Sequence, residues 1–168
     1  VLGERLAAAG LADRFVCPFL SPVPFEAMAS AEAALADAEG PTVVVGSSLG
    51  GYYATWLAEK HDLRAVLINP AVMAPVLLSS LVGTHTNFHT GVSFEFTFEH
   101  VEQLLALSAA TVSSARYLLL VETGDEVLDY RQAVERYAGS RQVVLEGGDH
   151  SFTRFPELVP QIIEFCGL

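Results

Sequence analysis

Hydrophobic residues along this chain follow two spacings in turn. Residues 42–45 form a continuous run that is mostly β-branched, which is typical of a strand buried on both faces of a parallel sheet. Tyr130, Val134 and Tyr137 recur instead at i, i+4 and i+7, the spacing of one helix face. Short apolar runs that alternate with helical segments predict an α/β fold, with a mostly parallel sheet flanked by helices.

The same patterns place an element on nearly every part of the chain. No internal repeat or low-complexity linker interrupts them, so we expect residues 1–168 to form a single domain. The predicted helices are 2–9, 25–38, 50–60, a segment around 130–137, and 155–165; the predicted strands are 15–17, 42–45, 65–68, 117–121 and 142–145.

A long insertion, residues 70–115, separates two of the predicted strands. Its helical spacing from Val101 to Ser108 predicts a short helical lid, preceded by a cluster of four phenylalanines. The rings would either roof a pocket for an acyl chain or fill the space beneath the lid. The charge-free stretch 65–94 contains prolines and polar residues, so we interpret it as a buried strand, a loop and a short helix, and not as a membrane span. The four rings are Phe88, Phe94, Phe96 and Phe98.

Composition excludes several classes of partner. The formal charge of −11 repels nucleic acids and anionic membrane surfaces. Cys17 and Cys166 match no metal-binding spacing and lie in apolar segments, so we expect buried free thiols. With no signal-peptide pattern at its start, the chain is predicted to be cytoplasmic.

A candidate nucleophile lies between a predicted strand and a predicted helix. Gly46-Ser47-Ser48-Leu49-Gly50 matches G-x-S-x-G, whose central serine sits on a strained turn with its Oγ lifted out of the sheet. Side chains at Gly46 or Gly50 are expected to collide with the neighbouring backbone, and Gly51 lets the helix approach more closely. An ordinary glycine-rich turn is the alternative, whereas the phosphate-binding glycine motifs are absent.

A serine hydroxyl needs a positioned base, usually histidine. His150 follows the last predicted strand, at the edge of the sheet where such folds place catalytic groups, and Gly147 and Gly148 let its loop curl back. A structural loop histidine is the alternative. We expect His61 to cap a helix. Three histidines of the insertion are assigned ordinary surface roles, with the lining of an entrance as the alternative: His85, His89 and His100.

An acid must orient the imidazole, and in this arrangement it lies between serine and histidine in the chain. Asp125 follows a glycine directly after the strand 117–121 and is the preferred candidate. Asp129 is the alternative, although an N-cap role at the next helix would explain it. Glu126 and Asp149 are expected to be solvated.

Four strings together resemble the YqiA/YcfP-like bacterial esterases, which are small α/β-fold hydrolases. The resemblance extends from about Val43 to the C-terminus and is weakest in the insertion. It implies that Ser48, Asp125 and His150 form a catalytic triad that hydrolyses carboxylic esters or acyl thioesters without a cofactor or metal. The four strings run from Val45 to Leu57, from Asn69 to Ala71, from Thr123 to Tyr130 and from Gly147 to Phe152.

The N-terminal part of the chain differs from the pattern of that family. Its members begin with a strand and a His-Gly-Phe loop that helps to form the oxyanion hole, and this chain lacks both. The backbone N–H of Leu49 would supply one oxyanion donor. We expect the second donor to lie upstream of Val1, in a native protein longer by roughly 15–25 residues.

The expected reaction is acyl transfer from a small-molecule ester or thioester to water through an acyl-enzyme. Two other functions stay open. An acyltransferase would use the same triad with an alcohol or amine acceptor, and a non-catalytic hydrolase-like binding module would not need the triad. Acyl length, leaving group and oligomeric state do not follow from the residues.

Overall fold

The main sheet has four parallel strands among the residues that the computed structural model describes, 1–86 and 91–168. Its order is β1-β2-β5-β6, so the two central strands are β2 and β5. All six residues of β5 and the last four of β2 are buried, and all of them except Glu122 belong to the continuous apolar runs expected between two helical layers. The strands are β1 (Val43–Ser47), β2 (Arg64–Ile68), β5 (Tyr117–Glu122) and β6 (Arg141–Leu145).

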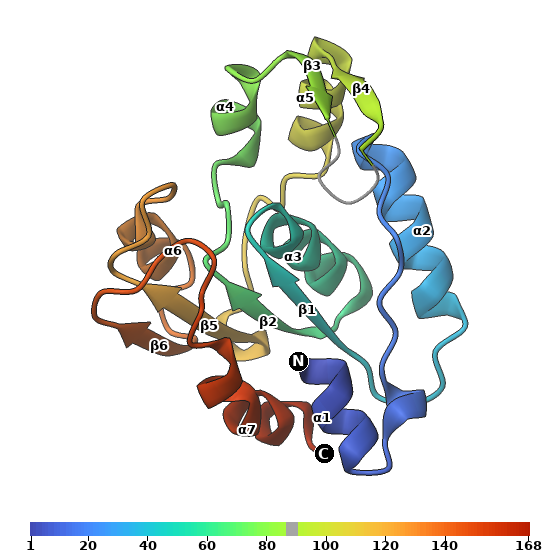
Figure 1. The fold of residues 1–168 in the computed structure, drawn as a ribbon, viewed down its shortest axis with the longest axis vertical. Helices are drawn as coiled ribbons and strands as arrows, with labels where there is room; N and C mark the ends of the chain where they lie inside the picture. The colour runs from blue at the N-terminus through green and yellow to red at the C-terminus, as the bar shows by residue number, and fades with distance from the viewer. Residues whose placement is uncertain (87–90) are drawn as a thin grey trace.

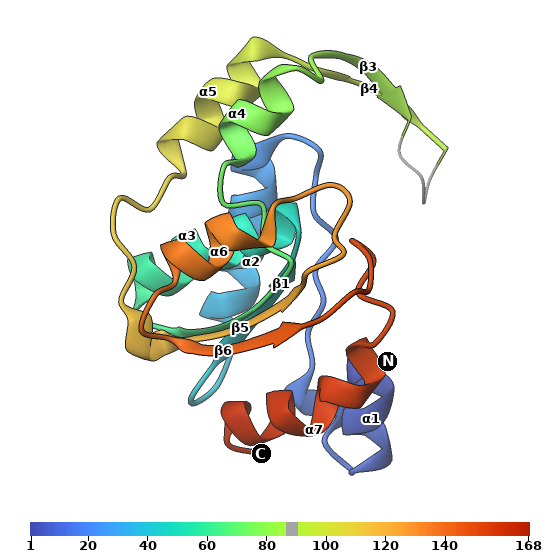
Figure 2. The same ribbon diagram turned by 90° about the vertical axis from the view of Figure 1, so that its left-hand side faces the viewer.

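Helices cover both faces of this sheet. α3 (Leu49–His61) and α6 (Tyr130–Arg136) lie on one face, and α7 (Phe155–Cys166) lies on the other with α1 (Leu2–Ala8) beside it (Figure 2). Successive side chains of a strand point to opposite faces. Leu119 accordingly packs with α3 and α6, whereas Leu118 packs with α7.

The segment between β2 and β5 forms a second layer above α3 (Figures 1 and 2). It contains α4 (Ala74–Ser79), the antiparallel pair β3 (Gly83–Thr86) and β4 (Ser93–Phe96), and α5 (Phe98–Ala106). Residues of α4 and α5 share an apolar cluster with α3 and with α2 (Pro24–Ala36). Two 3-10 turns, η1 (Ala12–Arg14) and η2 (Ser114–Arg116), complete the elements.

The insertion is more varied than the predicted helical lid. Its β3–β4 pair was not predicted, because Gly83–Thr86 carries no apolar alternation. The phenylalanines of the predicted cluster also differ in burial. Phe96 is buried in the core shared with α3, whereas Phe98 is 68% exposed. Phe94 is half-buried and stacks on His85, and Phe88 lies outside the described residues.

Three predictions near the start of the chain are wrong. Residues 15–17 join neither sheet, because the Phe15 ring lies against Gly3 of α1. Cys17 is exposed, whereas Cys166 is half-buried and its thiol pKa is raised by burial. β1 is not buried on both faces: Val45 is 39% exposed, because β1 is an edge strand of the described sheet.

All strands of the main sheet run in the same direction, so their carboxyl ends meet at one rim. Ser47 at the end of β1 pairs with Ile68 of β2, and Ile68 pairs with Leu120 of β5. Glu122 pairs with Leu145 of β6. The loops that follow these strands therefore start side by side. In the described residues, no helix combines the length and apolar character needed to cross a bilayer.

Candidate active site

Ser48 occupies a strained turn between β1 and α3. Its φ of 53° and ψ of −122° lie in a region that residues other than glycine rarely adopt. Its N–H donates to the carbonyl of Ile68 at 3.0 Å, and its own carbonyl accepts from the N–H of Ala71 at 3.0 Å. These bonds to the end of β2 and the turn after it hold the unusual conformation, as predicted for the elbow.

The glycines of the elbow have unequal roles. A Cβ at Gly46 would lie 2.1 Å from the carbonyl oxygen of Gly50, so the predicted collision is confirmed there. A Cβ at Gly51 would lie 2.7 Å from the Cβ of Pro70, so this glycine lets α3 approach the turn after β2. The predicted collision at Gly50 is wrong, because a Cβ there meets no atom within 4 Å and would point into open space.

The structure brings together the three side chains proposed from the sequence. Ser48 Oγ lies 3.0 Å from His150 Nε2. His150 Nδ1 lies 2.9 Å from Asp125 Oδ2 and 3.0 Å from Asp125 Oδ1. The Asp125 side chain is only 2% exposed and that of His150 is 22% exposed. The Asp125 carboxylate is thus shielded from solvent, whereas the His150 imidazole is partly exposed to it.

The two candidate acids have separate positions. Asp125 Oδ1 also accepts the backbone N–H groups of Val127 and Leu128, both at 2.8 Å, which fix its carboxylate toward the imidazole. Asp129 instead accepts the N–H of Arg131 at 3.0 Å, as the N-cap of α6. Only Asp125 of these two bonds to His150.

The His150 loop passes very close to the end of β5. Gly147 and Gly148 have φ of 71° and 78°, a conformation that favours glycine. A Cβ at Gly148 would lie 2.1 Å from Glu122 Oε2, and one at Gly124 would lie 2.5 Å from the carbonyl oxygen of Gly148. The glycines therefore permit the close approach that carries His150 toward Ser48.

Sequence reasoning missed Glu122, which supports this loop. It is fully buried at the end of β5, accepts the N–H of Asp149 at 2.8 Å, and pairs with Arg154 Nε at 2.6 Å. A buried carboxylate requires such partners. The available signal was a single glutamate that ends a run of apolar strand residues.

Glu126 is solvated as predicted, whereas Asp149 is less solvated than predicted. Glu126 is exposed, but its Oε2 accepts the backbone N–H of His150 at 3.0 Å, and this bond lowers the pKa of its carboxyl. Asp149 is half-buried, and its Oδ1 is buried without a hydrogen-bond partner among the described residues. Both carboxylates belong to the surroundings of His150 because they are tied to its loop.

The other described histidines lie elsewhere. His61 is the last residue of α3, and its Nε2 lies 2.8 Å from Glu32 Oε1, so the predicted capping role is wrong. His85 bonds to the carbonyl of Leu81, and His100 forms a capping box with Thr97 at the start of α5. No bond joins any of these three histidines to the triad, and His89 lies outside the described residues.

Leu49 directly follows Ser48, the candidate nucleophile. As the first residue of α3, it has a backbone N–H with no carbonyl to bond within the helix. Such N–H groups at a helix start attract negative charge. Its oxyanion role stays a prediction.

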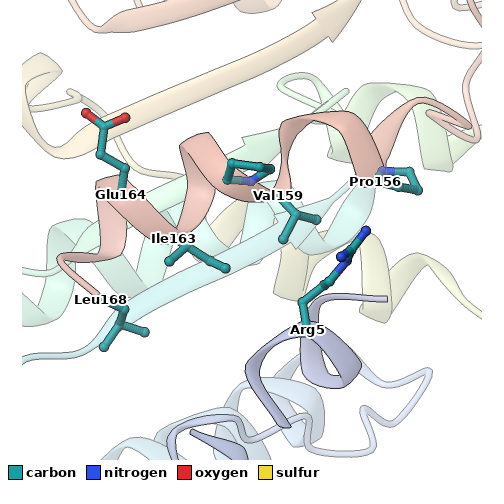
Figure 3. Close-up of a pocket in the computed structure, with 7 residues that line it drawn as sticks. Arg5, Pro156, Val159, Ile163, Glu164 and Leu168 are labelled. Carbon is teal, nitrogen blue, oxygen red and sulfur yellow. The ribbon is translucent and has the colours of Figure 1, made fainter. Parts of the chain in front are cut away.

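A hollow of the molecule lies away from this site. A hollow of about 480 Å³ lies between α1 and α7, with Arg5, Val159 and Ile163 among its lining residues (Figure 3). Ser48, Asp125 and His150 are not among them. Within residues 1–86 and 91–168, no group of three His, Cys, Asp or Glu side chains is arranged to hold a metal ion.

Solved structures with the same architecture are known. The esterase domain of a Rhodothermus marinus protein is 16% identical, with a TM-score of 0.61 over 96% of this chain and 78% of that chain. Est1E from Butyrivibrio proteoclasticus is 14% identical, with a TM-score of 0.60 over 87% of this chain and 72% of that one. Mouse alpha/beta hydrolase domain-containing protein 10 is 18% identical, with a TM-score of 0.59 over 84% of this chain and 68% of that chain. These matches confirm the predicted α/β-hydrolase fold.

A family model matches residues 3–167, which is nearly the whole chain. Its description is "Uncharacterised protein family (UPF0227)", the family to which the resemblance to YqiA/YcfP-like proteins points. The chain therefore belongs to the uncharacterised protein family UPF0227 and has an α/β-hydrolase fold.

Proposed function

We propose that this protein is a serine hydrolase that cleaves carboxylic esters or acyl thioesters through an acyl-enzyme. One observation carries the proposal: hydrogen bonds run without a break from Ser48 Oγ through the imidazole of His150 to the carboxylate of Asp125. This is the arrangement that activates a serine hydroxyl. The strained Ser48 backbone supports it, since such strain is typical of a nucleophile elbow.

The geometry supports a role for each side chain in this proposal. Ser48 Oγ attacks the acyl carbon while His150 Nε2 takes its proton, and Asp125 stabilises the imidazolium that forms. When the acyl carbon–heteroatom bond breaks, His150 returns the proton to the departing alcohol or thiol. Water then attacks the acyl-enzyme with His150 as base, which releases the acid and restores Ser48.

The Leu49 N–H is the proposed first oxyanion donor. The negative charge that develops on the acyl oxygen is stabilised by N–H groups that have no other acceptor, and the start of α3 offers one beside Ser48. The choice of esters is supported by two structural neighbours, an esterase domain and a monoacylglycerol lipase.

A fluorophosphonate probe tests the proposal directly, because it phosphonylates only activated serines. We expect the native chain to be labelled at Ser48, and we expect S48A to lose the label. H150A should lose it by at least about 10³-fold. Ser47→Ala is the matched control, since Ser47 is the neighbouring exposed hydroxyl and should leave labelling unchanged. Equal labelling of the native chain and H150A would contradict the role of His150.

A panel of esters and thioesters of graded acyl length then defines the reaction. Release of free acid in water is the expected result. Products measured with added alcohols and amines distinguish hydrolysis from transfer, since an acyltransferase would give mainly the acylated acceptor. Absence of turnover together with absence of labelling would indicate a binding module.

A further inference from the structure

The turn formed by Asn69, Pro70 and Ala71 joins the two halves of the proposed site. It follows β2, and all three of its residues are buried. The N–H of Ala71 donates to the carbonyl of Ser48 at 3.0 Å, and Pro70 lies against Gly51 of the elbow helix. One side of the turn therefore holds the nucleophile.

The Asn69 side chain bonds to the other half of the proposed site, the loop that carries His150. Its Nδ2 donates to the backbone carbonyls of Asp149 at 3.1 Å and of His150 at 3.3 Å. Its Oδ1 accepts the N–H of Glu122 at 3.0 Å, and its own N–H donates to the carbonyl of Leu120 at 2.9 Å. Asn69 thus bonds at once to β5 and to the loop that carries the base.

The conformation of Asn69 suits this task. Its φ is 38°, a value that asparagine tolerates better than most residues, and only 2% of the residue is exposed. A buried amide with both of its ends bonded is rigid, because breaking either bond leaves an unsatisfied polar group. Neither the triad nor the proposed oxyanion donor explains why this residue is an asparagine.

We infer that Asn69 is a positioning residue, which sets the approach of the His150 imidazole to Ser48 Oγ by clamping the backbone of residues 149 and 150. The inference rests on the proposed function. Glu122 and Glu126 complete the clamp, since they accept the N–H groups of Asp149 and His150. The backbone N–H and carbonyl of both residues are therefore all bonded to side chains from the rim.

Two substitutions separate the parts of the clamp. N69D keeps the shape, the tolerance of positive φ and an acceptor for the Glu122 N–H, but it replaces the donor with an oxygen that faces two carbonyls. N69G keeps the backbone conformation and removes every side-chain bond. We expect kcat per titrated Ser48 to fall about 10- to 100-fold in both, since a small misplacement of a catalytic group has an effect of this size. KM for a short-chain ester should change by less than about threefold, because the clamp contacts the base and not the substrate.

Active-site titration makes the test specific, because a residue that only stabilises the fold lowers the number of titrated sites and not the turnover of each. T55V is the matched control. Thr55 is buried and bonds to Tyr137 Oη at 2.7 Å, but not to residues 149 and 150. T55V should lower the Tm and leave turnover per site and KM as in the native chain. Should N69G fail to fold, N69D, which retains an acceptor for Glu122, carries the test alone.

A second measurement does not depend on activity. The proton between His150 Nδ1 and Asp125 should give a downfield ¹H NMR signal, assigned by its loss in H150Q, and this signal should broaden or shift in N69D and N69G but not in T55V. If the native chain hydrolyses no ester while the signal responds in this way, the proposed function fails and the positioning role stands. Asn69 variants with native turnover per site and an unchanged signal would overturn the inference.

Discussion

The rim that carries the candidate triad and the insertion between β2 and β5 are held together by different forces. At the rim, buried or half-buried polar side chains bond to loop backbone at nearly every step, as with Asn69, Glu122 and Asp125. The insertion instead packs through an apolar cluster, and several of its large apolar side chains face outward: Met73, Val76, Leu77, Leu81, Phe98 and Leu105.

Polar bonds join the insertion to the rest of the described chain mostly near its C-terminal end, where Ser113 donates to Glu59 and Arg136 donates to the carbonyls of Ala109 and Ala110. Its helix α5 contributes two more. Tyr52 Oη donates to the carbonyl of Leu104 at 2.7 Å, and the N–H of Phe25 donates to Gln103 Oε1 at 3.1 Å. Hydrogen bonds are directional, whereas apolar packing tolerates changes of shape at constant volume. The directional bonds of the rim set the geometry of the candidate site, so variants of the rim should change rates, whereas variants of the insertion should mainly change stability.

The largest expected effect separates the two candidate acids. D125N keeps the shape but removes the charge that stabilises the imidazolium, so kcat for ester hydrolysis should fall about 10³- to 10⁴-fold. D129N is the matched control, because Asp129 caps α6 and does not contact His150. It should keep kcat within about threefold. A larger loss in D129N than in D125N would reverse the assignment.

The elbow glycines should differ in their effect on folding. G46A forces a Cβ to within 2.1 Å of the Gly50 carbonyl oxygen, and this clash is with backbone atoms, which cannot rotate away as the end of a flexible side chain can. We expect a loss of about 4 kcal/mol in the free energy of unfolding, at the severe end for a single substitution. G50A, measured in the same urea titrations, should be neutral or slightly stabilising, because alanine favours a helix over glycine. Equal losses in the two variants would contradict the close approach of β1 and α3.

Substitutions of two phenylalanines in the insertion test whether apolar packing attaches the insertion to the rest of the chain. Phe96 is 8% exposed and belongs to the core shared with α3, so F96A should lower the free energy of unfolding by about 3 kcal/mol. F98A should change it by less than about 0.5 kcal/mol, because Phe98 is 68% exposed. Denaturant unfolding followed by Trp56 fluorescence measures both. If F98A proves the more damaging, the outward face of α5 is covered by something else.

The smallest expected effect concerns charge at the rim. Because the N–H of His150 lowers the pKa of the Glu126 carboxyl, the small stabilisation from this bond is present at neutral pH and is lost as pH falls through the lowered pKa. In E126Q this pH dependence should be absent, so acidification should lower the Tm by about 1 °C less than in the native chain. Glu157→Gln removes an exposed charge with no such bond and is the control. The difference should shrink in high salt, and a larger fall in Tm on acidification in E126Q than in the native chain would contradict the sign.

Much of the site followed from local patterns. Ser48 was identified by a strand, a glycine turn and a helix in succession, and His150 by its place after the last strand. Gly147 and Gly148 indicated a tightly curled loop. The choice of Asp125 over Asp129 also followed from position, because a residue directly after a strand lies at the rim, whereas a residue at a helix start has its own N–H groups to cap.

Other features did not follow, for identifiable reasons. The β3–β4 pair was missed because its first strand is polar and depends on its partner for hydrogen bonds. Residues 15–17 looked like a strand because their apolar character is the same whether they pair with a sheet or, as with Phe15, lie against a helix. The prediction that Cys17 is buried was wrong for the same reason. An apolar residue tends to be buried, but whether it is buried depends on the elements that pack against it.

By itself, the sequence determined the alternation of strands and helices, the order Ser48, Asp125, His150 and the turns that carry them, because these depend on spacing and on backbone conformations that only certain residues adopt. The tertiary structure alone decided which side chains bond across the rim, including Asn69 and Glu122. These two are separated from Asp149 by 80 and 27 residues, and no local spacing encodes contacts that exist only after parallel strands bring their carboxyl ends together.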